Sequence, residues 1–392
     1  MALTMDPTKT PLMAPPDGMT SNFENPDTRH AEVHIGMGVT LSFTVVFIFL
    51  RIYAKLTVSR LWGWDDWTCL VGWLAIVVHD IITFTVLDQG IGKHMWDVPV
   101  SSQDKAYLQR IFSTGCLYTV SSFFVKMSLF FLYLRIFNPN KITRWLVYGG
   151  MVVCAVFYSA CLIINCVIYL PGPGQADSYE IWVQRAVNGS KHGTSLVLAQ
   201  SIFGFISDTY LLIVPVQLIF KLQLPLSRKI GVSAIFATGL IAVACSIVSI
   251  VYRVRAYREV MGSTYGDQTW YGAPVFILSS AEISTGIVCS CMPIAFSLTR
   301  HPTIRKLGTQ LLSLTGIRSS RDDSEPPSKH SLNSGVFGRG PHRKFTATDS
   351  ITQMYPGKVT LPSDGSSSRY YIELENEPHL RESSLDMMRD NP

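Results

Sequence analysis

Four ionisable side chains fall inside long apolar stretches of this sequence: Asp80, Lys126, Asp208 and Glu282. A charge in a hydrocarbon layer costs at least ~2.5 kcal/mol unless a partner or water compensates it, so such residues usually pair, bind or switch. Counted from the same ends of their stretches, Lys126 and Asp208 lie at nearly the same depth, because a helix rises ~1.5 Å per residue. We therefore predict an ion pair between them, with either a structural or a switching role. Glu282 lies nearer the outer end, and we expect it to act independently, as a candidate ligand contact.

The elements that hold these residues are predicted to be membrane-spanning helices. The chain has 392 residues, 47% of them hydrophobic and 16% charged, which is more apolar surface than a soluble core needs. Seven apolar stretches approach or exceed the roughly 20 residues that a bilayer requires. We place them at 34–54, 67–87, 111–134, 145–170, 194–220, 230–252 and 272–298. The predicted fold class is an all-α membrane protein, a seven-transmembrane helix bundle.

Basic residues predict how the bundle is oriented. The short loops after the first, third and fifth spans are rich in Lys and Arg, for example Lys221, Arg228 and Lys229. Short basic loops stay in the cytoplasm, so we expect the N-terminus outside and the C-terminus inside. The net charge of +5 comes largely from these loops and the tail. Since no basic stripe with interleaved aromatic residues is present, we expect no nucleic-acid partner.

The flanking segments divide the chain into four predicted regions. Residues 1–33 are rich in Pro, Thr and Asp, and we expect a disordered extracellular leader before the membrane domain at 34–300. At 301–318, apolar residues at helical spacing alternate with basic ones, which predicts an amphipathic juxtamembrane helix on the inner leaflet. Residues 319–392 are rich in Ser, Pro and Gly and predict a disordered cytoplasmic tail.

Motifs along this chain resemble those of the fungal rhodopsin-like-domain integral membrane proteins. The matching pieces run in order through residues 34–300: GWDDW at 63–67, GIGKHMW at 90–96, KMS at 126–128, FLYLRIF at 131–137, Asp208, Pro215, KLQLPLSRKI at 221–230, Glu282 and CMP at 291–293. The resemblance implies a seven-helix, receptor-like fold. It does not imply retinal, because the Schiff base needs a lysine in the last helix and residues 272–299 contain none. We expect no cofactor.

Receptor-like folds often join the outer ends of the third and fourth helices, so the resemblance allows a disulfide between Cys116 and Cys166. The alternative is that all eight cysteines of the chain are free. The segment between the fourth and fifth spans also carries a sequon at Asn188, which predicts an extracellular glycosylation site if the orientation is as expected.

The outer loop carries Gly92, His94 and Trp96 in its motif. One hypothesis is that His94 binds a metal ion together with Asp88 and Asp97. Three such ligands in a glycine-rich turn are a weak signal, so we expect no metal.

We considered three classes of function. A GPCR-like receptor at the plasma membrane would bind an unknown small-molecule or surface ligand and a heterotrimeric G protein, with a link to fungal secondary metabolism or host interaction. A transporter is disfavoured because the sequence shows no internal repeat. An integral-membrane enzyme associated with a metabolite pathway is disfavoured because no metal, nucleophile or nucleotide motif is present, and we expect no enzyme.

Overall fold

The computed structural model describes residues 6–299 except 60, 138–140, 222–225 and 263–265. Within these residues the helices are α1 (His30–Ala54), α2 (Trp64–Leu87), α3 (Lys105–Phe137), α4 (Lys141–Tyr169), α5 (Tyr179–Lys221), α6 (Leu226–Gly262) and α7 (Gln268–Thr299). All seven hold a stretch that is long and apolar enough to cross a membrane, which confirms the predicted seven-span bundle. The amphipathic helix predicted at 301–318 and the tail predicted at 319–392 lie outside the described residues.

Several helices are longer than their apolar stretches. Helix α5 begins at Tyr179 although its apolar span was predicted from residue 194, and α6 continues to Gly262 although its span was predicted to end at 252. Hydropathy falls before the helix ends, because polar residues occupy the outer turns. In α6 this fall in hydropathy also conceals Arg253, which is buried inside the bundle.

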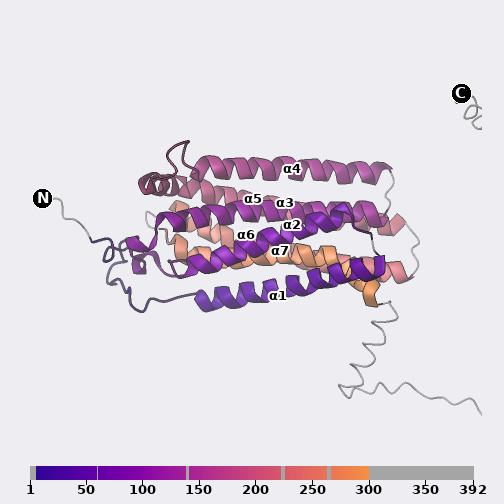
Figure 1. Cartoon of the computed structure of the whole chain (residues 1–392), viewed down its shortest axis with the longest axis horizontal. Coiled ribbons are helices and arrows are strands. Elements are labelled where there is room, and N and C mark those ends of the chain that lie inside the picture. Colours follow the sequence, from indigo (N-terminus) through magenta and orange to yellow (C-terminus); the bar gives the residue numbers. More distant parts are fainter. Residues whose placement is uncertain (1–5, 60, 138–140, 222–225, 263–265, 300–392) are drawn as a thin grey trace, which may run out of the picture. The chain divides into compact units, whose positions relative to one another are not determined.

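The helices run side by side (Figure 1). The apolar stretch of α3 is the most buried of the seven. Helix α3 contacts α2, α4, α5 and α7, whereas α1 packs mainly on α7 and, less closely, on α2. The remaining neighbours, α4 with α5, α5 with α6 and α6 with α7, close the bundle. This order brings residues of α3, α5, α6 and α7 toward one interior.

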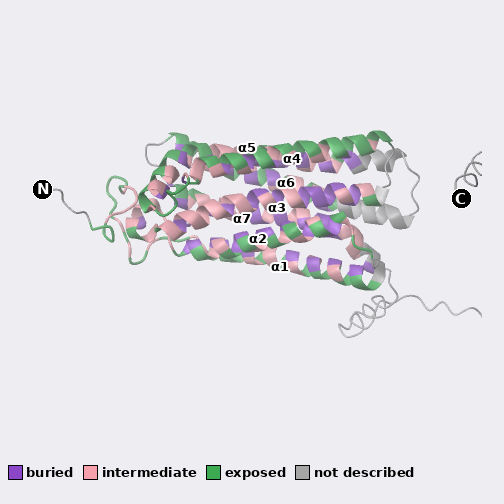
Figure 2. Cartoon of the chain, turned by 45° about the horizontal axis from the view of Figure 1, so that its top comes forward, coloured by how far each residue is buried: buried purple, intermediate pink, exposed green. Residues whose placement is uncertain are grey.

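The distribution of side chains is that of a protein whose outer surface contacts lipid. Large apolar residues such as Phe43, Val156 and Ile206 are exposed on the outer faces of their helices, while many serines, threonines and charged residues are buried. Figure 2 shows exposed positions along the outer faces of the bundle and buried positions along its inner faces. In a bilayer the apolar exterior faces hydrocarbon, and the interior polar groups must satisfy one another.

The leader does not have the predicted disorder over its described part. Residues 6–29 follow the loop between α2 and α3, with backbone hydrogen bonds from Leu12 N to Val98 O (2.9 Å) and from Arg29 N to Gly92 O (2.8 Å). The prediction is wrong here because composition does not reveal the free backbone groups that this loop offers as partners. We call the end of the bundle that carries residues 6–29 the leader end, and the opposite end, where α1 meets α2, the connector end.

Candidate functional site

A buried arginine of α6 forms the centre of a polar cluster inside the bundle. Arg253 is only 2% exposed. Its guanidinium donates to the hydroxyls of Tyr118 (3.0 Å), Ser279 (2.7 Å) and Ser201, and the carboxylate of Glu282 lies 3.8 Å away. The Tyr118 hydroxyl donates to Glu282 Oε2 (3.2 Å). Helices α3, α5, α6 and α7 therefore meet at one charged group.

Arg253 was not among the predicted site residues. It lies one position beyond the predicted end of the sixth span, in a segment rich in Arg and Tyr that looks like a polar flank. A signal was present: Ser246, Ser249 and Arg253 follow one another at helical spacing, and all three are buried. A polar stripe at that spacing indicates that the helix continues and that the stripe faces inward.

The predicted ion pair between Lys126 and Asp208 is confirmed. The Lys126 ammonium contacts Asp208 Oδ1 directly and lies 3.4 Å from the carbonyl oxygen of Gly204. Ser246 of α6 donates to the other carboxylate oxygen of Asp208 (2.8 Å). The pair therefore joins three helices, and its remaining lone pairs are partly satisfied.

Glu282 is not as separate from this pair as expected. A small cavity of about 30 Å³ is lined by both Asp208 and Glu282. A side-chain carbon added at Gly204 would meet Glu282 Oε1 at 2.7 Å, while Lys126 contacts the carbonyl of the same glycine. The absence of a side chain at Gly204 thus lets Glu282 approach the backbone beside the Lys126 ammonium.

Asp80 lies apart from the Arg253 cluster. Its two carboxylate oxygens bind His79 Nδ1 (2.9 Å) and the Ser280 hydroxyl (2.9 Å). Ser280 also contacts Thr40 of α1 (3.1 Å). Asp80 therefore connects α2 to α7 and α1, and its neighbour His79 lines the cavity described next.

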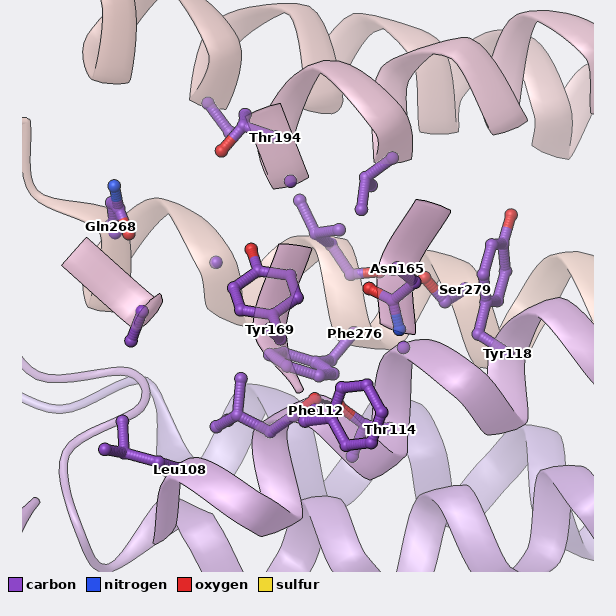
Figure 3. A pocket seen from close by; sticks show the side chains of 18 of the residues that line it. Leu108, Phe112, Thr114, Tyr118, Asn165, Tyr169, Thr194, Gln268, Phe276 and Ser279 are labelled. Carbon is purple, nitrogen blue, oxygen red and sulfur yellow. Dashed lines mark hydrogen bonds between the residues drawn. The ribbon is translucent and has the colours of Figure 1, made fainter. Parts of the chain in front are cut away.

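The Arg253 cluster lies at the inner end of a cavity that faces the leader end. This cavity has a volume of about 280 Å³ and is lined by α3 to α7 together with His79. In Figure 3, Tyr118 and Ser279 lie at one end of it, and Gln268 and Leu108 lie at the other. A second cavity of about 920 Å³ shares part of this lining and extends to Leu12 and Met13 of the leader.

Comparison with known proteins identifies the domain that holds this cavity. Residues 50–301 match the family model of the fungal rhodopsin domain. This chain belongs to the fungal rhodopsin domain family. No solved structure matches the chain.

Three relatives of this fungal rhodopsin domain protein are informative. It is 28% identical to a SAT4 family membrane protein of Emericella nidulans over 61% of this chain and 55% of the relative. It is 23% identical to the Fugralins biosynthesis cluster protein 2 of Gibberella zeae over 72% and 69%, and 22% identical to the Receptor GIN3 of Arthrobotrys oligospora over 68% and 62%. The matched region thus spans little more than half of the SAT4 relative.

The outer-loop motif of this fungal rhodopsin domain protein fixes the loop to the start of α7. The ring of His94 stacks between Trp96 and Trp270, with centroids at 4.3 and 3.9 Å, and its Nδ1 binds Asp267 (2.6 Å). Gly92 has φ of +83°, a conformation that glycine adopts without strain, and its N–H donates to the Thr269 carbonyl. The structure pairs His94 with Asp267 and not with Asp88 or Asp97, the partners in the metal hypothesis.

A second charged cluster lies at the connector end. Arg51 binds Asp65 (2.8 Å) and Asp66 (2.9 Å), Lys55 binds Asp66 (2.7 Å), and Arg135 binds Asp65 (2.9 Å). Carboxylates in the first turn of a helix, as here in α2, are expected to cap it. The cap exists, since the N–H of Gly63 donates to Asp66 (2.9 Å), but the buried network was missed. Arg51 lies inside a predicted span, three residues from its end, and was a detectable signal.

Two predicted modification sites have different outcomes. All eight cysteines are free thiols, so Cys116 and Cys166 do not form the proposed disulfide; Asn165 instead contacts the Cys116 sulfur (3.3 Å). Asn188 is exposed, but it lies within α5 and not in a loop as predicted. Its glycosylation stays a prediction.

Proposed function

We propose that this protein is a cell-surface receptor whose small-molecule ligand enters from the leader end and binds in the 280 Å³ cavity. The observation that carries the proposal is that this cavity ends at a buried charged group to which four helices contribute. Ligand sites are typically concave, mostly apolar and equipped with a few convergent polar groups. The Arg253 cavity has this composition.

A ligand at Arg253 would act on contacts between helices. Arg253 holds hydroxyls of α3, α5 and α7, and Glu282 lies beside Gly204, next to the Lys126–Asp208 pair. A ligand shifts a conformational equilibrium only if it binds one state better than the other. Since the cluster joins four helices, a ligand group that competes for Arg253 would weaken the contacts that hold these helices together.

The names of two relatives bear on this proposal. The name of the Arthrobotrys oligospora relative is that of a receptor, and the name of the Gibberella zeae relative places that protein in a biosynthesis cluster. In this proposal the protein senses a metabolite at the plasma membrane and has no catalytic role. The leader end faces outward, and a heterotrimeric G protein contacts the connector end.

The proposal is tested in reporter cells that express the full chain and receive fractions of a fungal metabolite extract. We expect at least one fraction to give a response that Ala256→Phe, which fills the cavity, abolishes at equal surface expression. Ala244→Phe places the same side chain on an exposed face of the same helix and should respond as the unaltered chain does. Equal responses from both variants would refute the cavity as the ligand site.

A further inference from the structure

The walls and the inner end of the Arg253 cavity differ in chemistry. Aromatic rings of Phe112, Tyr169, Trp182 and Phe276 line it, and its charged group, Arg253, lies at the cluster with the hydroxyls of Tyr118 and Ser279. Its volume of about 280 Å³ lies at the lower limit of small-molecule pockets, which are typically ~300–1,000 Å³. The part of the space next to Arg253 therefore has room for one or two rings, and the larger cavity toward the leader adjoins it.

The guanidinium of Arg253 has donor capacity that the protein leaves unused. Among the described residues, every acceptor within hydrogen-bond distance of it is a neutral hydroxyl, and Glu282 at 3.8 Å is beyond that distance. Its Nε is buried without a hydrogen-bond partner in the described part of the chain. A buried donor without a partner costs roughly 1–3 kcal/mol, more for a charged group, so this nitrogen of an arginine that lines the cavity calls for an explanation.

We propose that the cavity binds a small aromatic molecule that presents a carbonyl oxygen, as a ketone or a carboxylate, to Arg253. This inference rests on the proposed function, because it assigns a ligand class to the proposed ligand site. The aromatic walls stack on the rings of the ligand, and the carbonyl oxygen accepts hydrogen bonds from the guanidinium. The ligand oxygen supplies the acceptor that Arg253 lacks.

The ligand class is tested by binding to the purified full-length chain in detergent. The probes are 2-naphthoate, 2-acetylnaphthalene and 2-ethylnaphthalene, which share the ring system and differ in the acceptor. Saturation-transfer NMR and the thermal unfolding midpoint report their binding. Because a hydrogen bond to a charged group contributes ~1.5–3 kcal/mol, we expect 2-ethylnaphthalene to bind at least tenfold more weakly than one or both carbonyl probes. Equal affinity of all three probes would overturn the proposal.

Three variants locate the interaction. Arg253→Met combined with Glu282→Gln removes both buried charges together, which avoids leaving one unpaired, and should abolish the preference for the carbonyl probes. Ala256→Phe keeps Arg253 but should remove binding of all three probes, whereas Ala244→Phe should retain it. Should the double variant not fold, the probe comparison and the two alanine variants still decide the matter. Carbonyl-dependent binding that persists in Ala256→Phe would place the site elsewhere and refute the inference.

Failure of this inference and failure of the receptor proposal are distinguishable. A cellular response that requires the cavity but comes from a ligand without a carbonyl oxygen would refute the ligand class and leave the receptor standing. Carbonyl-dependent binding that is lost in Ala256→Phe, in a chain that gives no cellular response, would support the ligand class and count against the receptor.

Discussion

Lys126 and Asp208 should depend on each other for stability. The Lys126 side chain is 6% exposed and that of Asp208 is 13%, so each charge is desolvated and compensated mainly by the other. Removing one partner of such a pair typically costs ~3–5 kcal/mol, because the remaining charge stays buried. We expect Lys126→Met and Asp208→Asn each to destabilise the folded chain by an amount of this order.

The two losses should not add. In the double variant neither charge is left behind, so the cost should fall well below the sum of the single costs, with a coupling of ~1–3 kcal/mol. Residual contacts remain in both single variants. Without Lys126, Asp208 keeps the Ser246 hydroxyl, whereas without Asp208, Lys126 keeps the Gly204 carbonyl at 3.4 Å and the Glu282 carboxylate beside it.

The measurement is a double-mutant cycle on detergent-solubilised protein, followed by thermal or denaturant unfolding. The chain offers a matched control in the Lys105–Asp177 pair, which joins the same residue types at 3.2 Å on the exposed surface. Exposed pairs of this kind contribute little, so Lys105→Met and Asp177→Asn should show no measurable coupling. Additive losses for the buried pair, equal to those of the control pair, would refute the reasoning.

Three further outcomes are expected. His94→Ala should lower the free energy of unfolding by ~1–3 kcal/mol, since it removes the hydrogen bond to Asp267 and two ring stacks, and His94→Phe should recover part of the loss in thermal unfolding. Asp177→Cys, at an exposed position of the leader end, should react with an impermeant thiol reagent on intact cells, and labelling only after permeabilisation would reverse the orientation. Arg51→Met should lower the yield of folded protein sharply, and adding Asp66→Asn should restore part of it, whereas an unchanged yield in the single variant would contradict the buried network.

The bundle was predictable from sequence because its main determinant is local. A membrane-spanning helix satisfies its backbone within one segment, so length and apolar content identify it without knowledge of its neighbours. The Lys126–Asp208 pair was predictable for a related reason, since two buried charges at equal depth on helices of known direction have few other partners. Helix ends were less predictable, as α5 and α6 show. Hydropathy indicates which part of a helix can lie in lipid, but it does not indicate where the helical backbone ends.

The rest of the site depends on contacts that no local pattern encodes. Arg253 was missed because its charge suggested the end of a span. The hydroxyls that accept its hydrogen bonds come from three other helices, which no local pattern reveals. The structured leader was missed because its partners are backbone groups of a distant loop. The role of His94 was missed for a similar reason: Asp267 and Trp270 lie far from it in the sequence.

Two clusters of interior charges in this protein differ in the partners that hold them. At the connector end, three cations and two carboxylates bind one another at hydrogen-bond distance, which fixes α1, α2 and α3. Nearer the leader end, Arg253 is surrounded by neutral hydroxyls, and its carboxylate partner is farther away. Hydroxyls reorient at little cost and exchange partners, whereas a short buried ion pair does not. In the proposed receptor, the Arg253 cluster is therefore the part of the polar interior that a bound acceptor would rearrange, while the cluster at the connector end keeps α1, α2 and α3 together.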